Sequence, residues 1–225
     1  MIKKNKLILD TLKKGLVASC QPIPQGPMDK SSIILAMAKS SLIGGAKGLR
    51  IEGEKNIKLI KKNTNVPIVG LIKRNLSNYP VIITPFLSDI EKIANAGADI
   101  IAFDATNRNR PESVKSIINE IKKFNKISMA DCSSIFDVKN AIKSDVDIIS
   151  TTLSRYTKNK VPEYPDFKLL RESISLKIPV IAEGRFNTPY LAKKAIKMGA
   201  HCVVVGTALN RVEIITNNFV NTINE

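Results

Sequence analysis

The chain has 225 residues, of which 44% are hydrophobic, enough for one large domain or two small ones. Its formal net charge of +15 indicates anionic partners. No apolar run approaches the roughly 18 residues of a membrane span, and the apolar patch at 7–9 is shorter than the about 7–15 residues of a signal peptide core. We therefore expect a cytoplasmic protein that does not enter a membrane.

Cysteines and aromatic residues narrow the function classes further. The three cysteines, Cys20, Cys132 and Cys202, lie in or beside expected strands, where reduced thiols act as small apolar residues. Their spacing matches no metal site, so we expect no bound metal. Aromatic residues make up only 5% of the chain and tryptophan is absent, whereas single-stranded nucleic acids are bound by basic stripes interleaved with aromatic side chains. We therefore expect no nucleic-acid partner.

The predicted elements begin with a short amphipathic helix in the first 15 residues. Eight apolar runs bounded by turn residues follow, at 15–20, 47–53, 67–73, 99–106, 127–133, 147–153, 178–184 and 202–209. These runs are continuous rather than alternating, which is typical of parallel strands that are covered on both faces. The segments between them are amphipathic and long enough for helices.

Several helix boundaries are marked in the sequence. Thr84-Pro85 and Thr188-Pro189 each offer an N-cap followed by proline at the first helical position. Gly45, Gly97 and Gly199 each stand at the end of a predicted helix, just before the next strand. Eight strand–helix units predict a single-domain (β/α)₈ TIM barrel over residues 1–225. The alternative, a doubly wound sheet, has no G-x-G-x-x-G sequence after any strand.

Polar residues follow the predicted strands at their C-terminal ends, where TIM barrels hold their active sites. In chain order the strands end on Gln21, Arg50, Lys73, Asp104, Asp131, residues 150–152, Glu183 and Gly206-Thr207. Five of these ends are charged. Because buried charges must be paired or used, their convergence on one mouth indicates a functional site. Asp104 is the weakest candidate, since Arg108 or Arg110 stands close enough in sequence to pair with it.

The last two strand-to-helix loops predict an anion site. Gly184, which precedes Arg185, and Gly206, which precedes Thr207, each follow a strand and precede a helix. Glycine lets backbone N–H groups approach an anion closely, and these two loops are the usual phosphate site of TIM barrels. In the alternative interpretation, the two glycines only make tight turns and bind no anion. The sixth loop, 154–165, is long enough to be a lid or an ordinary surface loop.

A set of short motifs in order along nearly the whole chain resembles the N-acetylmannosamine-6-phosphate 2-epimerase family of bacterial sialic acid catabolism. The motifs are SCQ (19–21), GLRIEG (48–53), GLIKR (70–74), DATNR (104–108), MADCS (129–133), STTLS (150–154), IAEGR (181–185) and VVVG (203–206). The resemblance implies a cytoplasmic, cofactor-independent isomerase on a TIM barrel, which forms a homodimer and acts on a phosphorylated amino sugar. It also implies catalytic roles for Lys73 and Glu183, and substrate-binding roles for Gln21, Arg50, Asp131 and Arg211.

The chain departs from the family pattern in its loops. Gln25-Gly26 stands in the first loop where the family usually has an acidic residue before Pro27. Arg155 replaces a small residue, and Thr207 replaces a frequent serine. Asn210-Arg211-Val212 replaces the usual Thr-Arg-Pro. None of these departures falls on the expected acid–base pair.

The chemistry of C2 epimerisation requires a proton to be removed beside the C1 aldehyde and returned on the other face. A free lysine has a pKa near 10.4, so Lys73 would act as a base only if burial and neighbouring arginines lowered its pKa. Glu183 would then return the proton or open the sugar ring. Two alternatives remain: a Schiff-base aldolase that uses Lys73, and a non-catalytic protein that senses a sugar phosphate or binds RNA.

Overall fold

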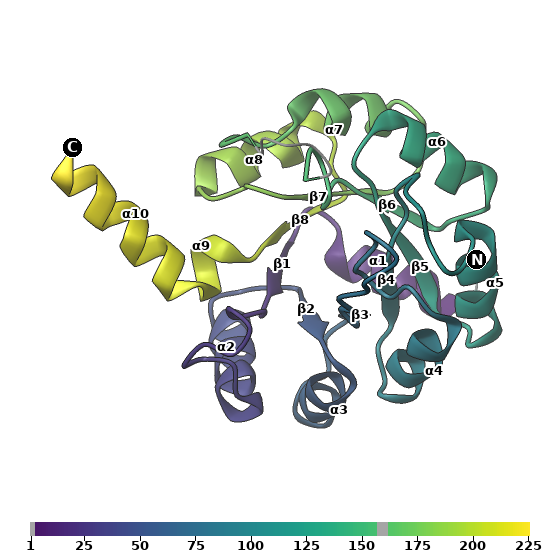
Figure 1. The fold of residues 1–225 in the computed structure, drawn as a ribbon, viewed down its shortest axis with the longest axis horizontal. Helices are drawn as coiled ribbons and strands as arrows, with labels where there is room; N and C mark the ends of the chain where they lie inside the picture. Colours follow the sequence, from purple (N-terminus) through teal and green to yellow (C-terminus); the bar gives the residue numbers. More distant parts are fainter. Residues whose placement is uncertain (1–2, 157–161) are drawn as a thin grey trace.

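The computed structural model describes residues 3–156 and 162–225, and its parallel strands close into a barrel in the order β1 to β8 (Figure 1). The strands are β1 Leu16–Ser19, β2 Gly48–Glu52, β3 Ile68–Leu71, β4 Ile100–Asp104, β5 Ile127–Asp131, β6 Ile148–Ser150, β7 Val180–Glu183 and β8 Cys202–Val205. The barrel closes where β1 pairs with β8. The TIM barrel prediction is confirmed, and the doubly wound alternative is wrong.

Helices alternate with the strands and surround them (Figure 1). Their bounds are α1 Lys3–Leu12, α2 Ser31–Ile43, α3 Glu54–Asn63, α4 Leu87–Asn95, α5 Val114–Lys123, α6 Ile135–Lys143, α7 Phe167–Ile174, α8 Pro189–Met198, α9 Thr207–Asn210 and α10 Val212–Asn224. Within the described residues, none of these helices has both the length and the apolar composition that crossing a membrane requires.

The continuous apolar runs arise because each strand is buried on both faces. Leu49 and Ile51 of β2 pack in the layer between the barrel and the helices. Val69 and Leu71 of β3 pack instead in the barrel interior. Successive side chains along a strand point to opposite faces, so apolar residues are needed at odd and even positions alike.

The N-terminal helix α1 closes the bottom of the barrel, opposite the strands' C-terminal ends. Leu12 is fully buried, and it packs with Ile8 and Leu9 against the interior apolar cluster. The Nε2–H group of His201 donates to the carbonyl of Leu9 at 2.8 Å, which ties α1 to the start of β8. Gly48 gives Leu12 room to pack, because a Cβ at position 48 would lie 2.6 Å from Cδ2 of Leu12.

Most of the predicted helix boundaries are confirmed. Gly45, Gly97 and Gly199 have φ angles of 94°, 99° and 107°, the left-handed conformation that ends a helix. Thr188 caps α8, since its side chain accepts the N–H of Leu191 and Pro189 follows at the first helical position.

The expected cap at Thr84-Pro85 is wrong, because α4 begins only at Leu87. Thr84 is fully buried, and its hydroxyl donates to the carbonyl of Ala102 at 2.7 Å. The same hydroxyl accepts the N–H of Ile72 at 3.3 Å. Thr84 therefore joins the middle of β4 to the residue that follows β3, instead of starting a helix.

The C-terminal helix α10 projects away from the barrel (Figure 1). It has no buried residue, although Val212, Phe219 and Ile223 are apolar and 52%, 68% and 79% exposed. Part of the expected lid, 157–161, lies outside the described residues.

Candidate active site

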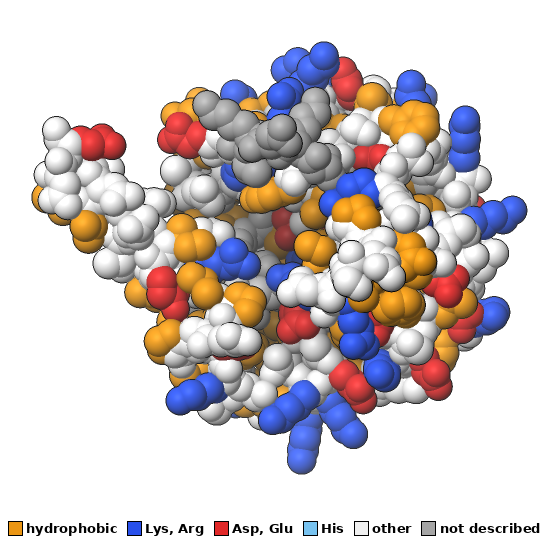
Figure 2. Space-filling view, in the orientation of Figure 1, with side chains coloured by type: hydrophobic (Ala, Val, Ile, Leu, Met, Phe, Trp, Pro, Cys, Tyr) orange, Lys and Arg blue, Asp and Glu red, His pale blue; other side chains and the backbone are white. Residues whose placement is uncertain are grey.

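A cavity of about 410 Å³ lies at the C-terminal ends of the strands. Figure 2 shows it as a hollow near the centre of that face, with acidic and basic side chains inside. Nine of the ten predicted site residues line it: Gln21, Arg50, Lys73, Glu183, Gly184, Arg185, Gly206, Thr207 and Arg211. The tenth, Asp131, is not among the described residues that line the cavity, because it lies fully buried against Arg50. The barrel therefore assembles almost the whole predicted set around one space.

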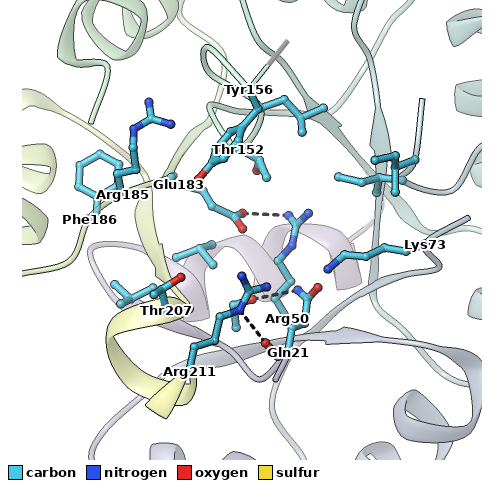
Figure 3. A pocket seen from close by; sticks show the side chains of 18 of the residues that line it. Gln21, Arg50, Lys73, Thr152, Tyr156, Glu183, Arg185, Phe186, Thr207 and Arg211 are labelled. Carbon is cyan, nitrogen blue, oxygen red and sulfur yellow. Dashed lines mark hydrogen bonds and ion pairs between the residues drawn. The ribbon is translucent and has the colours of Figure 1, made fainter. Parts of the chain in front are cut away.

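The floor of the cavity is an ion-pair network centred on Arg50, which is 2% exposed. Its Nη1 donates to Oε2 of Glu183 at 2.9 Å, a contact drawn in Figure 3. Nη1 and Nη2 also donate to the two carboxylate oxygens of Asp131, at 3.2 and 2.6 Å. Arginine's planar fork favours this two-point pairing, which compensates the buried charges.

Lys73 lies two residues beyond the end of β3, where it forms an isolated bridge with Ile83. It continues the inward-facing alternation of Val69 and Leu71 and reaches into the cavity (Figure 3). Its neighbour Arg74 turns outward and pairs with Asp89 of α4. The lysine that ends the strand therefore belongs to the site, whereas the arginine beside it belongs to the helix layer.

The surroundings of Lys73 favour its neutral form. Burial lowers the pKa of Lys73 most, and the positive charges of Arg50 and Arg211 lower it further. Glu52 and Glu183 oppose this shift. A lysine with a lowered pKa is a stronger candidate for a base, because more of it is unprotonated near neutral pH.

Glu183 is shifted in the opposite direction. Burial raises the pKa of Glu183 to about 7, against the attraction of Arg50, and the nearby charge of Asp131 adds to the increase. Two groups whose environments move their pKa values toward neutrality from opposite sides are typical of an acid–base pair.

The glycine turns of the last two loops differ from each other. Gly184 has a φ of 101°, and α8 begins only at Pro189, so that glycine makes a turn rather than a helix start. Gly206 directly precedes α9, and a Cβ there would lie 3.2 Å from Cβ of Ser19. Arg211 donates from Nε to the carbonyl of Gln21 at 3.2 Å and lines the cavity beside Gly206.

Two arginines that follow strands, Arg108 and Arg185, bind partners within the protein. Arg108 pairs with the buried Asp104 at 2.7 Å, so the expected local pairing of Asp104 is confirmed. Arg185 lines the cavity, but its guanidinium donates to the carbonyls of Ser154 and Tyr164, each at 2.9 Å. Arg185 therefore joins the two ends of the sixth loop.

The sequence reasoning missed Glu52, Asn75 and Tyr156. Glu52 accepts the backbone N–H of Lys73 at 3.3 Å and, with Lys73, lines an adjoining cavity of about 270 Å³. Glu52 could have been predicted from its position two residues after Arg50 on the same strand, because side chains two residues apart on a strand face the same side. Asn75 and Tyr156 reach the main cavity from loops, where no periodic pattern places a side chain.

A metal site of protein ligands would need several histidine, cysteine or carboxylate side chains close together. Over residues 3–156 and 162–225, no group of three or more such side chains is arranged to hold a metal ion.

Comparison with known proteins identifies the family. A family model described as "Putative N-acetylmannosamine-6-phosphate epimerase" matches residues 34–225. The chain belongs to this epimerase family. A relative from Glaesserella parasuis, named "Putative N-acetylmannosamine-6-phosphate 2-epimerase", is 50% identical over 97% of this chain and 94% of its own length. A relative of the same name from Haemophilus influenzae is 49% identical over 96% of this chain and 95% of its own length.

The epimerase family also includes a solved structure with the same architecture. The N-acetylmannosamine-6-phosphate 2-epimerase from Clostridium perfringens superposes with a TM-score of 0.92 and 39% sequence identity. The match covers 96% of both chains. The resemblance expected from the motifs is therefore confirmed over the length of the epimerase fold.

Proposed function

We propose that this protein is an isomerase that interconverts N-acetylmannosamine 6-phosphate and N-acetylglucosamine 6-phosphate. The observation that carries the proposal is the placement of Lys73 and Glu183 across the cavity. They follow or end β3 and β7, which are four strands apart in a closed barrel of eight and so lie on opposite sides. A sugar held between them presents one face of C2 to each group.

The reaction uses the two groups in sequence. Neutral Lys73 removes the C2 proton from the open-chain sugar, and Glu183 returns a proton to the opposite face. Negative charge that develops on the C1 oxygen is stabilised by the cationic Arg50 on the cavity floor. In the reverse direction the groups exchange roles, with Glu183 as the base and the Lys73 ammonium as the acid.

The phosphate of the substrate is bound at the β8 end of the cavity, next to Arg211, Gly206 and Thr207. Arginine forms charge-assisted hydrogen bonds to phosphate, and glycine permits close approach of the backbone. Gln21 also lines the cavity, where it is placed to contact the sugar. Removal of the phosphate should therefore make N-acetylmannosamine a very poor substrate, through weaker binding.

Proton NMR in D₂O tests the reaction directly. N-acetylmannosamine 6-phosphate and enzyme, with EDTA and no added nucleotide, should give N-acetylglucosamine 6-phosphate that carries deuterium at C2. A strict requirement for NAD or a divalent ion would contradict the proposal. Borohydride should trap no covalent adduct on Lys73, whereas a Schiff-base aldolase would be inactivated. A sensor would bind the sugar without exchange at C2.

We further propose that the protein is cytoplasmic and forms a homodimer. The phosphorylated sugar is a charged metabolite, which favours a cytoplasmic enzyme. The unpacked α10 favours a second copy as the cover of its apolar residues, which recur at helical spacing: Val212, Ile215, Phe219 and Ile223. In a chain of net charge +15, α10 contains no lysine or arginine. Two copies of a basic chain repel each other less on a face free of positive charge, and a two-fold axis brings the same face of both copies together.

A further inference from the structure

Asp131 is placed where a substrate cannot reach it. It is fully buried at the last position of β5, and the described residues that line the cavity include Arg50 but not Asp131. Its Oδ1 accepts from Arg50 Nη1 at 3.2 Å and from the Thr152 hydroxyl at 2.8 Å. Its Oδ2 accepts from Arg50 Nη2 at 2.6 Å. Both oxygens are therefore already engaged within the protein.

Arg50 connects Asp131 to the reacting group. The two hydrogen bonds from the guanidinium to Asp131 fix the plane of the fork. The same Nη1 that faces Asp131 also donates to Oε2 of Glu183 at 2.9 Å. A change at Asp131 therefore reaches Glu183 through one shared nitrogen.

We infer that Asp131 is a positioning residue, which orients Arg50 and shares its charge, and so sets both the position and the proton affinity of the Glu183 carboxyl. It does not touch the substrate. This inference rests on the proposed epimerisation, in which Glu183 exchanges a proton with C2. It also changes the role expected from the family resemblance, in which Asp131 bound the sugar.

The groups around Glu183 fix the direction of the effect. Arg50 faces it from β2, Lys73 from beyond β3, Asp131 from β5 and Cys202 from β8, and the nearby Thr152 side chain lowers its pKa. Burial raises the pKa of the Cys202 thiol to about 12, so that thiol stays neutral. Arg50 and Lys73 lower the pKa of Glu183, and Asp131 raises it.

Neutralising Asp131 therefore has two effects of the same sign. The repulsion between the two carboxylates disappears, and the charge of Arg50 is no longer shared. Both changes favour ionised Glu183, so its pKa should fall below the value of about 7 in the native protein.

The test is the pH profile of kcat/KM for Asp131→Asn beside wild type. Wild type should show a limb with its midpoint near pH 7, the pKa of Glu183 in the free enzyme. In Asp131→Asn this limb should move to lower pH by about 1–3 units, the range that a neighbouring charge produces. The KM should change little, while kcat falls. A large increase in KM with an unmoved limb would instead make Asp131 a substrate ligand and overturn the inference.

Asp104→Asn is the matched control. Asp104 is the neighbour of Asp131 in the register between β4 and β5, it is equally buried, and it pairs with a different arginine, Arg108. Its removal should cost stability but leave the limb in place. If the midpoint of the limb shifted equally in both variants, the cause would be a general loosening of the protein rather than the loss of Asp131, and the inference would fail.

Two further measurements keep the outcomes separate. If Asp131→Asn does not fold, Asp131→Glu is measured in its place, because it retains the negative charge. It should lower kcat by misplacing Arg50, while the midpoint of the limb stays near pH 7. The titration of ¹³C-labelled Glu183, followed by NMR in wild type and variant, measures the pKa without turnover. An inactive wild type would contradict the proposed function, whereas an active one with an unmoved Glu183 pKa contradicts only this inference.

Discussion

At the scale of single residues, the assignment of Lys73 depends on which way two adjacent basic side chains point. Lys73 faces the cavity, whereas Arg74 pairs with the fully buried Asp89 of α4. The two residues are neighbours in the chain and both are basic, yet one reaches into the cavity and the other pairs with a helix. Substitution of each by methionine should therefore produce opposite phenotypes.

Lys73→Met should fold normally, bind substrate and lose about 10²–10⁴-fold in kcat, because a positioned acid–base group contributes that much. Arg74→Met should retain most of its kcat but lose about 1–3 kcal/mol of stability, because Asp89 is left buried without its partner. Steady-state rates and urea unfolding would be measured for both. If Lys73→Met kept more than about a tenth of the wild-type rate, it would not be the base.

The raised pKa of Glu183 also links activity to stability. Because its pKa is about 7 in the folded protein and about 4.3 in an unfolded chain, the folded state binds this proton more tightly. Its contribution to stability is therefore complete below about pH 4.3 and is lost as pH rises through 7. Urea unfolding from pH 5 to 8 should show a steeper loss of stability in wild type than in Glu183→Gln. Identical pH dependence in the two proteins would mean that Glu183 is not buried as described.

At the scale of elements, α1 determines whether the barrel interior is sealed. Leu12 is fully buried in the interior apolar cluster, whereas Leu7 on the same helix is 68% exposed. Leu12→Ala should therefore cost about 2–5 kcal/mol of unfolding free energy, and Leu7→Ala less than about 0.5 kcal/mol. Thermal and urea unfolding measure both.

The catalytic end should be unaffected by this change. The kcat of Leu12→Ala, assayed where the protein is fully folded, should match wild type because α1 lies at the opposite end of the barrel. Equal stability losses for Leu12→Ala and Leu7→Ala would show that α1 does not seal the barrel.

At the scale of the whole molecule, the proposed dimer predicts that α10 controls the oligomeric state. Phe219→Asp places a charge in the apolar face of α10, so it should shift the protein toward monomers. Asn221→Asp adds the same charge on the opposite side of the helix and should leave the dimer intact. Analytical ultracentrifugation of both variants and wild type measures the outcome, and a monomeric wild type would contradict the proposal.

The sequence alone predicted the barrel and a polar site at the C-terminal ends of its strands, and the family resemblance implied the pair of Lys73 and Glu183. These features depend on local patterns: apolar runs that repeat along the chain, and side chains that alternate along a strand. The ends of parallel strands meet at one mouth, so the ends of β1 to β8 could be read as one site. The motif resemblance then added the substrate, which no periodic pattern contains.

Only the tertiary structure decided which charges pair. Asp131, Arg50 and Glu183 come from three strands far apart in sequence, and their contacts depend on how side chains of different length meet inside the barrel. The same applies to Thr84, whose buried hydroxyl joins β4 to the residue after β3, and to Arg185, which holds the sixth loop. Each side chain takes the partner that long-range packing brings within hydrogen-bonding distance, and a local sequence pattern carries no information about that distance.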